Sequence, residues 1–150
     1  MVPLWAFNDN LNTSFMNSDS ISKNFTFDEF EYSHTAEKLG LKNEIPNETV
    51  RRAVRLLVLN VLQPLRDTYG KPLFVNSGYR SSDLNKAVGG SNSSQHLRGE
   101  AADIAAEDPL LLLRLIKENN LPFDQLIIYD DFIHISYSSS GKQRARIIYK

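Results

Sequence analysis

The order of its hydrophobic patterns is the feature that most constrains the fold of this chain. Three short apolar runs close the sequence: Gln125 to Tyr129, Phe132 to Tyr137 and Arg144 to Tyr149. The turns Asp130-Asp131 and Ser138 to Gly141 join them. Strands joined by such short turns pair as antiparallel hairpins, because a parallel crossover needs a dozen or more residues. The end of the chain therefore predicts a small antiparallel sheet.

An amphipathic helix is predicted before these strands. It begins after Asn47, whose side chain is a favourable N-cap, and Pro64 lies late in it, where proline kinks or ends a helix. Apolar residues at the spacing of one helix face are Val50, Val54, Leu57, Val58, Val61, Leu62 and Leu65. This face predicts a helix that packs on the core.

Shorter elements are expected around this helix. Thr26 and Glu29 fit a capping box, Ser33 can cap a second short helix that ends at Gly40, and Asp108-Pro109 can begin another. Residues 100–106 can form a strand of small side chains. Because most helices precede the strands, the fold class predicted is α+β, with helices packed on a small antiparallel sheet.

Composition excludes several classes of protein. The 150 residues suit one domain, which we expect to be a monomer, and 41% hydrophobic with 23% charged residues is ordinary for a globular chain. No apolar stretch is long enough to predict a membrane span. The net charge of −1 provides no basic field for nucleic acid. Since there is no cysteine, any metal site must use nitrogen and oxygen ligands.

One carboxylate stands in an unusual place. In the stretch SSQHLRGEAADI, Asp103 follows two alanines, and a strand over residues 100–106 puts it on one face with Ala101 and Ala105. An ionised group among methyl groups costs free energy unless a positive partner offsets it. The run FIHISY likewise puts His134 on one strand face with Phe132 and Ser136.

Two imidazoles and one carboxylate, from His96, Asp103 and His134, are a ligand set that suits Zn²⁺ and leaves the fourth position for water. A bound dication would also offset the desolvation of Asp103. The alternative is that each histidine is a satisfied core or rim residue and that the aspartate caps a turn. Spacing by itself does not decide between them.

A longer pattern carries a resemblance. Ser94, His96, Gly99, Ala101 and Asp103 reproduce Ser-x-His-x-x-Gly-x-Ala-x-Asp. With SGYRS (77–81), LNKAVGGSNSSQH (84–96), FDQLI (123–127) and IHISY (133–137), the chain resembles the zinc D-Ala-D-Ala carboxypeptidase family of M15 type, in its peptidoglycan-peptidase branch. The resemblance covers residues 25–150 and implies a Hedgehog/DD-peptidase-like fold with Zn²⁺ on His96, Asp103 and His134.

The resemblance also implies catalytic residues. The family's general base lies three places before the last ligand, which is Asp131 here, although many relatives have glutamate there. In an ideal strand an odd offset points away from His134, so Asp130 is the fallback, and both can equally be plain turn residues. Arg80 matches the arginine that holds the substrate carbonyl and stabilises the oxyanion. Without the motif, the simplest interpretation of Arg80 is a surface residue that forms an ion pair.

Three further polar residues are expected near the metal or the substrate. Ser94 and Gln95 can donate hydrogen bonds there, and Ser136 can satisfy the second ring nitrogen of an imidazole ligand. All three are predicted to contribute to substrate binding.

The resemblance implies a zinc metallopeptidase that hydrolyses peptidoglycan stem peptides or their precursors. Two specificities stay open: removal of terminal D-alanine, and cleavage of L-alanyl-D-glutamate bonds, as in endolysins. The alternative is a non-catalytic, zinc-containing module that binds cell-wall peptides. We divide the chain into an N-terminal arm, 1–24, and a peptidase domain, 25–150. The first residues lack the pattern of a secretory signal, so we expect none, and both the cytoplasm and release to the cell wall by a phage remain open.

Overall fold

The computed structural model describes residues 19–150. Its strands are β1 (Ser20–Ser22), β2 (Phe25–Thr26), β3 (Val75–Ser77), β4 (Ala101–Ala105), β5 (Gln125–Ile128), β6 (Phe132–Ser136) and β7 (Arg146–Tyr149). Its helices are α2 (Phe27–Glu31), α3 (His34–Leu39), α4 (Glu48–Leu57), η2 (Val58–Leu62), α5 (Gln63–Tyr69), α6 (Ser82–Ala87), η3 (Gln95–Arg98) and α7 (Pro109–Glu118). The α+β prediction is confirmed.

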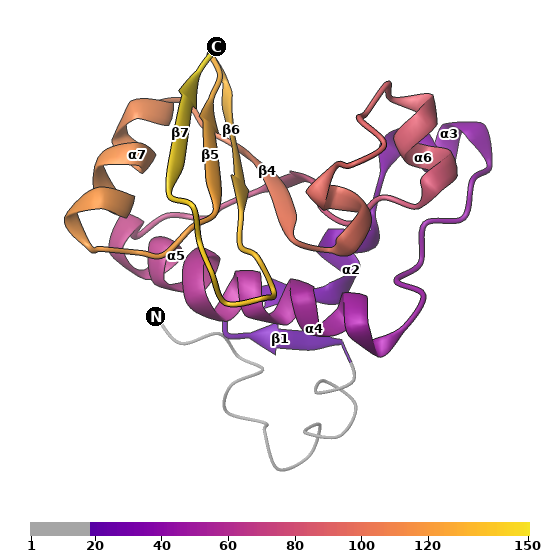
Figure 1. Cartoon of the computed structure of the whole chain (residues 1–150), viewed down its shortest axis with the longest axis horizontal. Helices are drawn as coiled ribbons and strands as arrows, with labels where there is room; N and C mark the ends of the chain where they lie inside the picture. Colours follow the sequence, from indigo (N-terminus) through magenta and orange to yellow (C-terminus); the bar gives the residue numbers. More distant parts are fainter. Residues whose placement is uncertain (1–18) are drawn as a thin grey trace.

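Five strands form the main sheet in the order β3-β4-β6-β5-β7 (Figure 1). The pairings of β3 with β4, β4 with β6 and β5 with β6 are antiparallel, as predicted. The pairing of β5 with β7 is parallel, so the expectation of a wholly antiparallel sheet is wrong at this edge. The reason is that β4 and β5 occupy both edges of β6. After β6 the chain therefore crosses to the free edge of β5. Because β7 begins beside Gln125, the first residue of β5, β7 runs in the same direction as β5.

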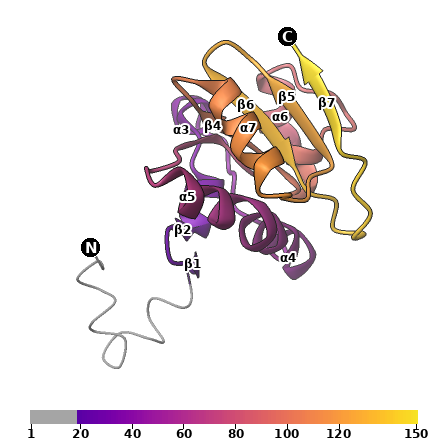
Figure 2. The ribbon, with the colours of Figure 1, turned by 90° about the vertical axis from the view of Figure 1, so that its left-hand side faces the viewer.

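The register of the strands separates two faces of the sheet. Ile104 pairs with Ile133, and Ile135 pairs with both Ala102 and Leu126, so these side chains share the face that is buried in the core. The other face carries Asp103, His134 and Ile127 in one row across β4, β6 and β5. α7 contacts β5 and α5, and Figure 2 shows this helical layer beside the sheet.

The long helical segment follows the sequence pattern and adds a detail that the pattern did not give. Asn47 caps α4, since its side chain accepts a hydrogen bond from the backbone N–H of Val50. Proline does not end the helix. Instead, η2 widens to π geometry immediately before Pro64, which stands in the first turn of α5. A wider turn relieves the clash between the proline ring and the preceding helical carbonyl groups.

Shorter helices begin and end where their caps predict. Ser33 caps α3, Gly40 ends it in the left-handed conformation, and Asp108 caps α7. Most of the arm predicted for residues 1–24 lies outside the described residues, but Ser20–Ser22 pairs with β2, and the boundary stays a prediction. No helix within residues 19–150 is long and apolar enough to cross a membrane.

Candidate metal centre

The first histidine is held by a short turn between α6 and β4. Ser94 begins η3, and its hydroxyl accepts a hydrogen bond from the backbone N–H of His96 at 3.2 Å. Gly99 ends η3 with φ +75°, and a Cβ there would lie 2.8 Å from the carbonyl oxygen of Val50. Glycine is required at this position because the chain must turn left-handed against helix α4. His96 is thereby buried, with 2% of its surface exposed.

The other two residues of the predicted triad come from neighbouring strands. Asp103 and His134 are directly paired across β4 and β6, and the Nδ1 atom of His134 lies 3.0 Å from Oδ1 of Asp103. The Nε2 atom of His96 lies 3.3 Å from the same oxygen. One ligand atom from each of His96, Asp103 and His134 lies within 4.8 Å of the others. The structure thus brings together the three residues that the sequence motif selected.

The hydrogen bonds of His96 fit a metal ligand. Its Nδ1 lies 2.7 Å from the carbonyl oxygen of Gly78, so this nitrogen is the donor. Its Nε2 then carries the lone pair, and this buried atom has no hydrogen-bond partner among the described residues. Ligand atoms around a tetrahedral metal with bonds of about 2.0 Å are about 3.3 Å apart. Asp103 Oδ1 stands at that separation from Nε2, so the donor set and its spacing fit a zinc ion.

Asp103 is ionised in this environment. Burial raises the pKa of its carboxyl group, but the close contacts of its oxygens with the rings of His134 and His96 outweigh burial and hold the pKa well below its usual range. The carboxylate is therefore an anionic ligand at neutral pH. The groups that lower its pKa also offset the free-energy cost of placing a charge between alanines.

Arg80 reaches the triad from the segment after β3. Its Nη2 lies 3.5 Å from Oδ2 of Asp103, while Nε donates to the hydroxyl of Ser77 at 3.1 Å and Nη1 to the side-chain oxygen of Asn85 at 3.4 Å. Burial lowers the pKa of the guanidinium and the charge of Asp103 raises it. An arginine stays protonated under such conditions, so Arg80 is a fixed positive charge beside the triad.

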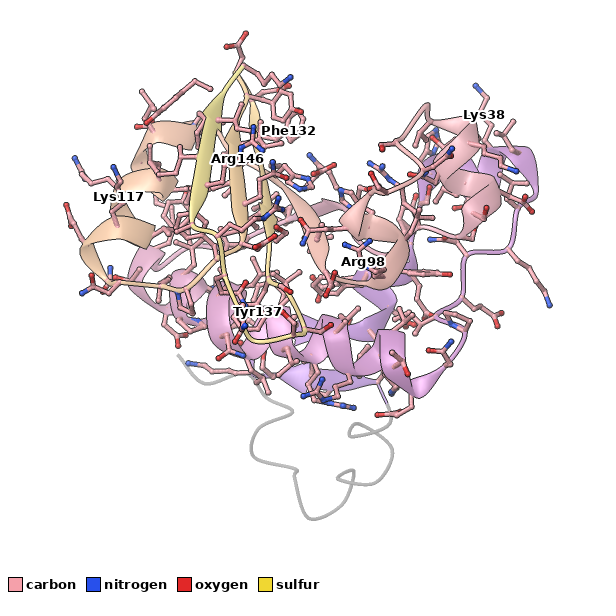
Figure 3. The ribbon with its side chains drawn as sticks, in the orientation of Figure 1. Lys38, Arg98, Lys117, Phe132, Tyr137 and Arg146 are labelled. Carbon is pink, nitrogen blue, oxygen red and sulfur yellow. The ribbon has the colours of Figure 1, made fainter. Side chains whose placement is uncertain are left out.

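The triad lies in a cleft of about 950 Å³. One wall comes from the exposed face of the sheet, with Ile127, Tyr129 and Phe132, and the other includes Arg98 at the end of η3. Phe132, at the start of β6, and Arg98, at the end of η3, are both labelled in Figure 3. The rings of Tyr129 and Phe132 stack with centroids 4.1 Å apart and 8° between their planes. The cleft therefore offers polar, cationic and aromatic contacts around one possible metal position.

Comparison with known proteins identifies the family. A family model described as Peptidase M15 matches residues 23–136, well over half of the chain. This chain belongs to the peptidase M15 family. It is also similar to a curated protein named zinc D-Ala-D-Ala carboxypeptidase, from Streptomyces albus G, with 45% identity over 56 residues. That match covers 37% of this chain and 22% of the relative, so the chain spans about a fifth of the relative's length.

The cofactor prediction is confirmed by these findings together. The M15 family and the name of the relative imply Zn²⁺, and the group formed by His96, Asp103 and His134 could hold a metal ion. His34 is exposed on α3 and does not belong to this group, so among the described residues it is not a fourth ligand.

Two of the three predicted substrate contacts line the cleft of this M15 peptidase, and the third does not. Ser94 and Gln95 line it, although the Ser94 hydroxyl already accepts from His96 and Gln95 Nε2 donates to Asp124 at 3.1 Å. Ser136 is fully buried, and its hydroxyl accepts from the backbone N–H of Gln125 at 3.0 Å. The proposed contact of Ser136 with substrate is therefore corrected: its side chain ties β6 to β5.

The predicted acid/base residues are not brought to the cleft. Asp130 and Asp131 form the exposed tip of the β5–β6 hairpin and are not among the residues that line it. The backbone oxygen of Asp131 accepts from the N–H of Ala106 at 3.0 Å, which fixes the backbone of this turn. The offset from His134 does not decide this outcome, because Asp130, at an even offset, also lies outside the lining of the cleft.

Two buried carboxylates were missed or misread from the sequence. Glu100 directly precedes β4, at an odd offset from Asp103, and only 5% of it is exposed. Asp124 is 4% exposed and accepts hydrogen bonds from the side chain of Arg144 at 2.7 to 3.1 Å. Arg98, two residues from Glu100, is a local partner, but Ser139 and Arg144 lie 39 and 20 residues away from the carboxylates they bind, so no local pattern signals those contacts. The only signal was Asp124 in the FDQLI stretch of the resemblance.

Proposed function

We propose that this chain is a zinc-dependent peptidase that hydrolyses peptide bonds in peptidoglycan stem peptides or their precursors. The observation that carries the proposal is the arrangement of two imidazole nitrogens, 3.0 and 3.3 Å from one carboxylate oxygen, in an open cleft. A catalytic zinc site has three protein ligands of this kind and keeps one position open. Membership of the M15 family supports a peptidase, and the relative's name supports D-Ala-D-Ala carboxypeptidase activity.

His96, Asp103 and His134 would hold the zinc ion. When bound, Zn²⁺ supplies a Lewis acid that polarises a carbonyl and lowers the pKa of water. Arg80 is our candidate for the group that orients the substrate carbonyl and stabilises negative charge on its oxygen during attack. Its hydrogen bonds to Ser77 and Asn85 support this role because they fix the guanidinium before substrate arrives.

Proton transfer to the leaving amine is assigned to Asp131, with Asp130 as the alternative. Both carboxylates stand at the tip of the β5–β6 hairpin, outside the cleft lining. For either to act, the hairpin tip must bend toward the cleft when substrate binds. This observation favours a second candidate function, a zinc-containing module that binds cell-wall peptides without turnover.

Metal content and activity test the proposal together. The purified protein should carry about one zinc ion per chain. His96→Ala should lose the ion, whereas His34→Ala, at an exposed position on α3, should keep it. Equal zinc content in the two variants would overturn the metal site.

Mass spectrometry of purified muropeptides after incubation with the protein should show which bond is cleaved and so separate the two specificities. Asp131→Ala should retain zinc and fold but lose hydrolysis, and Asp130→Ala tests the alternative assignment. Unchanged turnover in Asp131→Ala moves the role to another residue. Zinc binding without hydrolysis of any muropeptide by the unaltered protein would favour the binding module. The monomeric state stays a prediction, and a sedimentation measurement checks it.

A further inference from the structure

The connection between β6 and β7, residues 137–145, is held in place by two buried carboxylates. The side chains of Glu100 and Asp124 are 6% and 5% exposed. A buried carboxylate is costly unless donors satisfy its oxygens. Glu100 accepts from the backbone N–H and the hydroxyl of Ser139, both at 2.7 Å. Asp124 accepts from the backbone N–H of Arg144 at 2.9 Å. The two carboxylates thus fix the connection near both of its ends.

Further contacts make this connection rigid. The side chain of Gln143 accepts from the backbone N–H of Ser138 at 2.8 Å and donates to its carbonyl oxygen at 2.9 Å. Ala145 has φ +53°, a left-handed conformation that is unfavourable for alanine. Its N–H donates to Phe123 at 3.1 Å, which holds the strained residue in place. Such strain persists only where surrounding structure determines the geometry, and it is concentrated at functional sites.

This rigid connection carries two cations to the cleft, Lys142 and Arg144. The ammonium group of Lys142 has no hydrogen bond or ion pair with any residue in the range 19–150. The Nε and Nη2 atoms of Arg144 bind Asp124, while Nη1 has no partner in the same range, and its side chain is 58% exposed. Donors therefore remain for a ligand in the cleft.

The charge of the cleft favours an anionic ligand. Four cationic side chains line it, Arg80, Arg98, Lys142 and Arg144, against two carboxylates, Asp103 and Asp124. Asp103 is bound within the triad and by Arg80, Asp124 is bound by Arg144, and Arg98 pairs with Glu100. Of the four cations, Lys142 has no carboxylate partner among residues 19–150. A zinc ion on the triad would add further positive charge. Low-dielectric walls of one sign concentrate ligands of the opposite charge.

We propose that Lys142 and the free Nη1 edge of Arg144 form a subsite that binds a carboxylate of the peptide substrate, held in position by Glu100 and Asp124. The inference rests on the proposed peptidase function and narrows its substrate class to anionic peptides. Ile127, Tyr129 and Phe132 line the same cleft and suit small apolar side chains of the same peptide. Lys142 and Arg144 determine specificity because they bind the carboxylate equally in the bound substrate and in the transition state. They take no part in bond cleavage.

The test compares two matched peptides on the zinc-loaded full chain. One is L-alanyl-D-glutamyl-L-lysyl-D-alanyl-D-alanine, which contains both candidate bonds, and the other has its free carboxylates converted to carboxamides. The acid form should have a kcat/KM about tenfold higher or more, since hydrogen bonds to charged groups are the strong ones. Lys142→Met should reduce this ratio several-fold, mainly by raising KM for the acid form. Lys117→Met, on α7 and away from the cleft residues (Figure 3), should leave the ratio unchanged.

The outcomes separate the subsite from the peptidase function. Cleavage of both peptides at equal kcat/KM, or a ratio that Lys142→Met leaves unchanged, overturns the subsite and leaves the peptidase. If the unaltered protein cleaves neither peptide, the peptidase proposal fails, and calorimetric affinities of the same two peptides decide the subsite. If the acid form binds more tightly than the carboxamide form, and Lys142→Met removes this difference, the subsite is supported. Equal affinities of the two peptides for the unaltered protein overturn the subsite. Thermal unfolding of Lys142→Met checks that its fold is retained.

Discussion

Replacement of Glu100 by glutamine should destabilise the protein through the connection between β6 and β7. The Glu100 carboxylate accepts from the Ser139 N–H and hydroxyl at 2.7 Å each and from Nε of Arg98 at 2.8 Å. In Glu100→Gln the amide oxygen can accept from one side, and the serine hydroxyl can rotate to accept from the new NH₂ group. The Ser139 N–H then has no acceptor when the amide oxygen faces Arg98.

The magnitude follows from these contacts. An unsatisfied buried donor costs about 1–3 kcal/mol. The lost charge on the Arg98 pair adds at most about 1 kcal/mol, because the arginine side chain is 55% exposed. The free energy of unfolding should therefore fall by about 2–3 kcal/mol. For a domain of this size, Tm should fall by about 5–10 °C.

The effect should depend on pH in one direction. Burial raises the pKa of Glu100, but the hydrogen bonds from Ser139 and Arg98 outweigh it and lower the pKa in the folded protein. A carboxyl whose folded pKa is lowered stabilises fully above its unfolded pKa of about 4.3. This contribution is lost as pH falls through the folded pKa. The stability gap between the unaltered protein and Glu100→Gln should thus be largest near neutral pH and shrink in acid.

Urea unfolding at a series of pH values from 7 to 3 measures this gap. Glu118→Gln is the matched control, because Glu118 is 60% exposed and its contact with Arg114 is 3.5 Å long. The control should change stability by less than about 0.5 kcal/mol. A loss in Glu100→Gln no larger than in the control, or a gap that does not change with pH, would refute the assignment of Glu100 as a buried, ionised anchor.

Three other substitutions test the fold and the site. In Gly78→Ala the new Cβ would lie 2.7 Å from the Cα of Phe30, so the backbone that holds His96 must move. The free energy of unfolding should fall by about 1–3 kcal/mol, and zinc titration should show weaker binding. Unchanged zinc affinity would contradict the role of the Gly78 carbonyl. Ile133→Ala, at a fully buried position on β6, should cost about 2–5 kcal/mol in urea unfolding, and Ile133→Val only about 0.5–1.5 kcal/mol; similar costs would argue against a tightly packed core there. Asp108→Ala should cost about 1 kcal/mol by removing the cap that accepts from Leu111 at 3.2 Å, with Asp108→Asn as the control that keeps most of the stability.

Local patterns gave the elements of this protein more reliably than their pairing. Caps at Ser33, Asn47 and Asp108 act within one turn of their own helix, so they can be read without knowledge of the rest of the chain. The parallel pairing of β7 with β5 could not be read in this way, since it depends on which strand edges the earlier strands leave free.

The site shows the same division. His96, Asp103 and His134 could be selected from the sequence because the motif and the alternation of strand faces are local features, and a metal ion requires those residue types. The distances between them depend on the register of β4 with β6, in which Asp103 faces His134 across the two strands.

The sequence by itself determined most of the helices, the strands β4 to β7 and the three residues of the triad, because caps, periodicity and ligand chemistry act over short stretches of chain. Only the tertiary structure decided where the buried charges lie. It placed Glu100 and Asp124 against the connection that carries Lys142 and Arg144 to the cleft, and it left Asp131 at a hairpin tip outside it. Partners separated by 20 to 39 residues meet only after the sheet has formed, so no local pattern encodes their contact.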